Sequence, residues 1–122
     1  MVSEIRGHFD AQGTPWIQLQ TPYGIPLSLI VDTRFNGELV LPERILDALG
    51  LTPRGRVRVE LADGSRVYTD IYECKVFWFE QERVVSVFST AAEEGLFGTQ
   101  MLRGCTLLLD LEASLVVLAQ KT

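Results

Sequence analysis

Hydrophobic residues alternate with polar residues along much of this chain, and this period of two constrains its fold more than any other feature. Ile17 and Leu19 alternate with glutamines, and Val57 and Val59 alternate with arginines. Such alternation is typical of strands that bury one face, because successive side chains of a strand point to opposite sides. We therefore predict strands over residues 3–9, 15–20, 25–32, 56–62, 66–79, 83–89, 105–111 and 114–120.

Two segments interrupt this alternation with features of short helices. Residues 42–50 begin with a proline and end with a glycine, which is typical of a helix and its two ends. Residues 98–104 are a shorter candidate. Between the strands, Asp63-Gly64 is the sharpest turn signal, because a type I′ hairpin turn needs positive φ at both central residues. The pattern predicts a compact all-β barrel with two small helices, forming a single domain over 1–122.

Composition narrows the class of protein further. The chain has 122 residues, of which 47% are hydrophobic, and a formal net charge of −5. These values are typical of one folded domain and argue against intrinsic disorder. No apolar run approaches the ~18 residues that a membrane-spanning helix needs. The acidic balance argues against partners such as nucleic acid or an anionic membrane surface.

The N-terminus and the cysteines together favour a reducing compartment. The first residues lack the basic-then-apolar layout of a signal peptide, so we expect a cytoplasmic location. Cys74 and Cys105 are then expected to be reduced thiols in the core. With one histidine and no paired-cysteine motif, the sequence predicts neither a metal site nor a cofactor.

Asp32 is the residue most suggestive of chemistry. It directly follows the apolar run 28–31, where an ionised carboxylate is costly unless it has partners or a function. A simple alternative is an aspartate at a strand end whose side chain caps a backbone N–H. The segments that give Asp32 a more specific meaning are Ile30-Val31-Asp32-Thr33, Phe35-Asn36-Gly37 and, much later, Leu96-Phe97-Gly98-Thr99 with Leu102.

In their order and spacing, these segments resemble the two signatures of retropepsin-like aspartic proteases, in particular the small single-domain bacterial type. The resemblance spans roughly residues 25–120 and implies a closed β-barrel with a flap hairpin. It also implies an aspartic-type endopeptidase, a hydrolase in which two carboxylates share a proton. One carboxylate is ionised and activates water, while the other is protonated and polarises the scissile carbonyl of an extended peptide.

Because the chain supplies only one such aspartate, the resemblance implies a homodimer in which Asp32 meets Asp32 of the second copy. Thr33 would form a hydrogen bond across the dimer, and Gly98 would support the active site. The hairpin with Asp63, Gly64 and Ser65 at its tip would be the flap that closes over substrate.

Arg34 departs from the family motif, which is Asp-Thr/Ser-Gly. An arginine that reached Asp32 would favour the ionised carboxylate and remove the shared proton, whereas an arginine pointing away would leave the pair intact. The sequence thus leaves two functions open on this fold. One is an active peptidase, and the other is a catalytically impaired peptide-binding module.

A second resemblance covers the segments 39–51 and 55–59. They are similar to the swapped-hairpin DNA-binding domains of bacterial transition-state regulators and antitoxins, which also run strand, Leu-Pro, short helix, Leu-Gly, strand. Those domains are about half as long, and their DNA-binding faces are basic. A DNA-binding protein is therefore a further alternative, which does not account for the β-rich sequence that follows.

Overall fold

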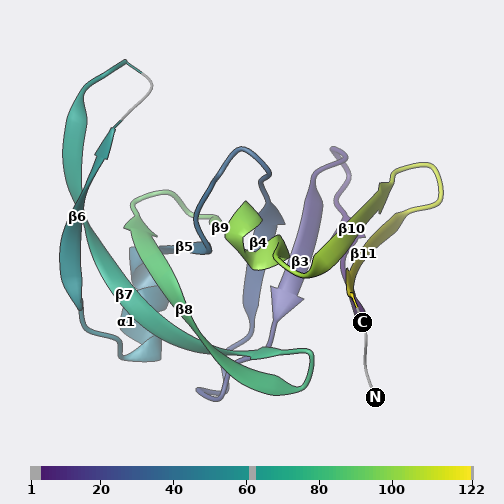
Figure 1. Ribbon diagram of the computed structural model, residues 1–122, viewed down its shortest axis with the longest axis horizontal. Helices are drawn as coiled ribbons and strands as arrows, with labels where there is room; N and C mark the ends of the chain where they lie inside the picture. The colour runs from purple at the N-terminus through teal and green to yellow at the C-terminus, as the bar shows by residue number, and fades with distance from the viewer. Residues whose placement is uncertain (1–3, 61–62, 122) are drawn as a thin grey trace.

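The computed structural model describes residues 4–60 and 63–121 and is dominated by β-strands. One α-helix, α1, and one short 3-10 helix, η1, interrupt them (Figure 1). The elements in chain order are β1 (Glu4–Arg6), β2 (His8–Phe9), β3 (Pro15–Leu19), β4 (Leu27–Val31), β5 (Leu39–Pro42), α1 (Glu43–Leu49), β6 (Gly55–Glu60), β7 (Arg66–Trp78), β8 (Gln81–Thr90), β9 (Gly95–Phe97), η1 (Thr99–Leu102), β10 (Cys105–Asp110) and β11 (Leu115–Gln120).

The strands form two sheets. A three-stranded sheet has the order β1-β11-β10, with both pairs antiparallel. The other sheet has eight strands in the order β2-β3-β4-β9-β5-β8-β7-β6. The three-stranded sheet lies on the right in Figure 1, and the long β6–β7 hairpin rises on the left.

The centre of the larger sheet has an unusual connection. Strand β9 lies between β4 and β5, parallel to the first and antiparallel to the second. The loop that joins β4 to β5 must therefore pass over the end of β9. This arrangement brings the end of the apolar run 28–31 next to a segment about 65 residues later in the chain.

The predicted strand 3–9 is wrong in one respect, because Gly7 divides it between the two sheets. The Gly7 N–H donates to the Val116 carbonyl in the three-stranded sheet at 2.8 Å. A Cβ on Gly7 would lie 1.9 Å from the carbonyl oxygen of Trp16, in the larger sheet. Only a glycine allows both backbones to approach this closely, and the strand changes sheets there.

The type I′ turn is also not where the sequence predicts it. Among the described residues, strand β6 pairs with β7 as far as Glu60 and Arg66. Gly64 has a φ of +85°, whereas the φ of Asp63 is not positive. Residues with positive φ at both central positions are instead Phe79 and Glu80, which join β7 to β8.

The two predicted helices have different outcomes. Residues 43–49 form α1, which ends at Gly50 in the left-handed conformation, with the Gly50 N–H donating to Asp47 O. The predicted helix over 98–104 is instead a single 3-10 turn, η1, over Thr99–Leu102. It ends two residues before Gly104, which has a positive φ.

The core lies between the larger sheet, α1 and the three-stranded sheet. Its buried members include Ile17, Leu29 and Val87 from the strands and Leu46 from α1. Cys74 is buried and Cys105 half-buried, and both are free thiols. No helix among the described residues is long and apolar enough to cross a membrane.

The segment that resembles the DNA-binding domains is part of this same architecture. It forms β5, α1 and β6. Strand β5 is held inside the larger sheet, where it pairs with β8 on one side and β9 on the other. Both neighbours of β5 therefore come from the same chain.

Candidate active site

Asp32 is the first residue after β4, at the point where β4 and β9 end together. Val31 pairs with Phe97, and the Asp32 N–H donates to the Phe97 carbonyl at 3.0 Å. The residue is half-buried. The two segments that the sequence analysis singled out, 30–33 and 96–99, are therefore neighbours in space.

Hydrogen bonds between backbone groups connect the loop 32–38 to the segment that follows β9. The Thr99 N–H donates to Phe35 O at 2.9 Å, and the Gln100 N–H donates to Gly37 O at 3.0 Å. The Gly98 N–H donates to Glu38 O at 2.8 Å. Because these bonds connect both sides of the loop to η1, the position of Asp32 depends on this contact.

The structure requires a glycine at position 98 because there is no space for a side chain, and not because of the backbone dihedral angles. Its φ of −96° is accessible to any residue. A Cβ at this position would lie 2.2 Å from the carbonyl oxygen of Gly37 and 2.5 Å from the Phe35 ring. Gly98 therefore supports the loop by letting the two backbones meet closely.

Arg34 fits the site without strain, because its φ is not positive. Its backbone N–H donates to Asp32 Oδ1 at 2.9 Å, which is also the contact expected of an aspartate at a strand end. The Arg34 side chain is exposed, and among the described residues it forms no ion pair with Asp32 within 4.0 Å. Within the described chain, the Arg34 guanidinium therefore does not pair with the Asp32 carboxylate.

The predicted flap residues lie at the tip of the β6–β7 hairpin. Asp63 Oδ1 accepts hydrogen bonds from the Ser65 hydroxyl at 2.6 Å and the Ser65 N–H at 2.9 Å. These two bonds lower the pKa of Asp63. In Figure 1 the hairpin tip and the β4–β5 loop project toward the same side of the molecule.

Strand register shows which face of the hairpin continues the surface beside the candidate site. Phe35 in the loop meets Phe88 edge to face, with ring centroids 6.1 Å apart. Phe88 pairs with Ile71, so these two side chains lie on the same face of the sheet. Along the hairpin this face carries Val57, Thr69, Val59 and Val67, because the pairing continues without a bulge.

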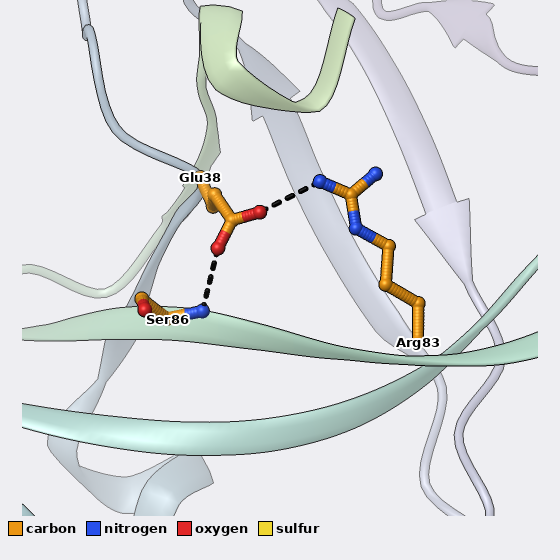
Figure 2. A network of polar contacts seen from close by, with 3 residues as sticks. All are labelled: Glu38, Arg83 and Ser86. Carbon is orange, nitrogen blue, oxygen red and sulfur yellow. Dashed lines mark hydrogen bonds and ion pairs between the residues drawn. The ribbon is translucent and has the colours of Figure 1, made fainter. Parts of the chain in front are cut away.

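A polar network that the sequence analysis missed borders the same loop. The Glu38 carboxylate accepts hydrogen bonds from Arg83 at 2.7 Å and from the Ser86 N–H at 2.8 Å (Figure 2). The Arg83 guanidinium lies over the Trp78 ring, 5.2 Å from its centroid. The one signal in the sequence was a carboxylate between Gly37 and the apolar run 39–41, because a charged side chain next to a buried strand is costly without partners.

The site offers no arrangement for a metal ion in the described part of the chain. Residues 4–60 and 63–121 contain no group of three or more histidine, cysteine or acidic side chains placed to hold one.

Comparisons with known proteins bear on the fold. No protein-family model matches the sequence, and no curated protein matches it. Among solved structures, the chain is similar to a retropepsin-like aspartic protease from Rickettsia conorii, with a TM-score of 0.76 and 16% sequence identity, over 98% of this chain and 92% of that one. It is also similar to the EIAV protease in complex with an inhibitor, with a TM-score of 0.57 and 14% identity, over 78% and 90% of the two chains.

A third similar structure is the foamy viral protease-reverse transcriptase in complex with an RNA/DNA hybrid. The TM-score is 0.54 and the identity 12%, over 72% of this chain but only 11% of that larger protein. Together these likenesses show that the chain has the retropepsin-like fold. The all-β class and the resemblance predicted from residues 30–37 and 96–102 are confirmed at the level of the fold.

Proposed function

We propose that this protein is an aspartic-type endopeptidase that acts as a homodimer, with one Asp32 from each copy at a shared active site. The observation that carries the proposal is the position of Asp32 at the joint end of β4 and β9 in a retropepsin-like fold. One Asp32 is ionised and takes a proton from water, whose oxygen attacks the peptide carbonyl carbon. The other is protonated and donates its proton to the carbonyl oxygen, which gives a tetrahedral diol. The first carboxyl then returns the proton taken from water to the amide nitrogen, the C–N bond breaks and the amine leaves, while a diol hydroxyl gives its proton back to the second carboxylate as the carboxylic acid product forms.

Three features support this assignment. Arg34 makes no ion pair with Asp32 in the described chain, so the carboxylate can share a proton with a second one. Thr33 is exposed beside it and available to a second copy. The face of the β6–β7 hairpin that carries Val57, Val59 and Val67 would give Asp63, Gly64 and Ser65 the role of a flap over an extended peptide.

The edge of the three-stranded sheet would offer a surface for the second copy. Among the described residues, β10 pairs only with β11, so its other edge has free backbone groups. Leu108, Leu109 and Leu111 on and after this strand are 51%, 44% and 62% exposed. Exposed leucines along an open strand edge are typical of a surface that pairs with another chain.

A peptide-binding module without catalysis is the second candidate, and the exposed Arg34 favours it. In a dimer two such cations would lie near two Asp32 carboxylates, and a cation close to the pair would keep both carboxylates ionised. The fold and the peptide would be the same, but no bond would be broken.

Cleavage of a mixed peptide library between about pH 3 and pH 8 distinguishes the two candidates. The proteins to compare are the wild type, Asp32→Asn and Arg34→Gly, each first shown to be folded. Cleavage by the wild type that disappears in Asp32→Asn supports the peptidase. Cleavage by Arg34→Gly alone supports a peptidase disabled by its arginine, and peptide binding without cleavage in all three supports the binding module.

A further inference from the structure

Among the side chains of the candidate-site loop, the Glu38 carboxylate accepts the most hydrogen bonds. Its backbone carbonyl accepts the Gly98 N–H at 2.8 Å, next to η1. Its carboxylate accepts the Ser86 N–H at 2.8 Å and an Arg83 N–H at 2.7 Å (Figure 2). One residue at the end of the loop thus connects the loop to β8 and to the start of η1.

Arg83 is connected to Asp32 through contacts with Trp78 and Phe97. The Arg83 guanidinium lies over the Trp78 ring, and the Trp78 ring stacks on Phe97 with centroids 6.0 Å apart. The carbonyl oxygen of Phe97 is the acceptor for the Asp32 N–H. The ion pair and the two aromatic rings therefore form a continuous series of contacts between Glu38 and the residue whose carbonyl binds the Asp32 N–H.

This ion pair is the most sheltered of those among the described residues. The side chains of Arg83 and Glu38 are 29% and 22% exposed. In the other three pairs both side chains are between 42% and 68% exposed. A sheltered, charge-assisted contact orients its partners more strictly than an exposed pair, which solvent screens.

We propose that Glu38 is a positioning residue, which holds the loop 32–38 through Arg83 and Ser86 so that Asp32 keeps its orientation. The part of this inference that concerns catalysis rests on the proposed peptidase function. The part that concerns the loop does not depend on that function, because the hydrogen bonds between the loop and the segment that contains η1 can be measured in any case.

The test is Glu38→Gln, with Glu73→Gln as the matched control. Glu73 forms an ion pair with Arg54 at 3.4 Å, but in that pair both side chains are about half or more exposed. Hydrogen exchange is measured at the amides of Gly98, Thr99 and Gln100, which donate to carbonyls of the loop. Glu38→Gln is expected to accelerate exchange at these amides roughly tenfold or more, the change that corresponds to losing a charge-assisted contact.

The control variant and the strands β10 and β11 are expected to exchange at the wild-type rate. If the amides of Gly98, Thr99 and Gln100 exchange within about twofold of the wild-type rate in Glu38→Gln, the proposal is overturned, because the ion pair would then not hold the loop against this segment. A uniform acceleration over the whole chain would overturn it too, because it would show a stabilising contact without local effect.

Catalysis provides a second, separate measurement. For any peptide that the wild type cleaves, Glu38→Gln is expected to lower kcat at least about tenfold and leave KM nearly unchanged, because Asp32 is misplaced while the peptide still binds. An unchanged kcat would contradict the positioning of Asp32. If the wild type cleaves no peptide, the proposed function fails, and hydrogen exchange alone decides the role of Glu38.

Discussion

Replacing Gly98 with alanine tests the close approach on which the candidate site depends. The new Cβ would lie 2.2 Å from the Gly37 oxygen, about 1.2 Å inside the 3.4 Å of an ordinary contact, and 2.5 Å from the Phe35 ring. Neither the backbone nor the packed ring can move aside alone. We therefore expect destabilisation at the upper end of the range for overpacking, about 3 kcal/mol.

Urea unfolding followed by tryptophan fluorescence measures this loss, with Gly55→Ala as the matched control. Gly55 lies in β6 with no atom within 4 Å of its added Cβ, and its φ is not positive, so the same substitution is expected to be neutral or slightly stabilising. The loss in Gly98→Ala corresponds to a fall in Tm of roughly 10 °C for a domain of this size. Equal midpoints for the two variants at equal m-values would refute the steric argument.

Further predictions concern pH, thiol chemistry and surface charge. The hydrogen bond from the Trp16 indole at 2.9 Å is the largest cause that lowers the pKa of Asp10. The contribution of the Asp10 carboxylate to stability is therefore present above about pH 4 and is lost as pH falls toward the folded-state pKa. Asp10→Asn should flatten the dependence of the urea midpoint on pH below about pH 4, and an unchanged dependence would contradict this. Burial raises the pKa of both thiols, that of Cys74 to about 11. Because Cys105 is only half-buried, a maleimide should label Cys105 in native protein and reach Cys74 only after unfolding, and equal labelling rates would contradict this. Arg34→Ala should change the free energy of unfolding by less than about 0.5 kcal/mol, since the side chain is exposed, and a larger loss would reveal a contact that the structure lacks.

The longer strands could be predicted from the sequence because each buries one face. Strands β5 and β9 could not be predicted in this way, because Leu39–Pro42 and Gly95–Phe97 are too short to show a period. Both also lie in the middle of a sheet and are covered on both faces, so their hydrophobic residues do not alternate with polar ones. The type I′ geometry at Phe79 and Glu80 was equally hidden, because neither residue favours positive φ. There the tertiary structure overrides the local preference, with the Phe79 side chain buried against Trp78.

In the candidate site, too, some features could be predicted from the sequence and others could not. The neighbourhood of Asp32 and Gly98 followed from a resemblance in order and spacing, and the paired ends of β4 and β9 bring them together. The role of Glu38 depends on Arg83 and Ser86, which are 45 and 48 residues away in the chain. No periodicity connects residues so far apart, and only the folded sheet shows that one carboxylate satisfies both partners.

The most direct measurement for the proposed function is a subunit-mixing experiment. Wild type and Asp32→Asn are mixed at fixed total protein, allowed to exchange subunits, and assayed on a peptide that the wild type cleaves. If each active site takes one Asp32 from each of two copies, mixed dimers are inactive, and an equal mixture retains about a quarter of the wild-type activity. Retention of about half would show that each copy acts alone, and would contradict the shared pair of carboxylates.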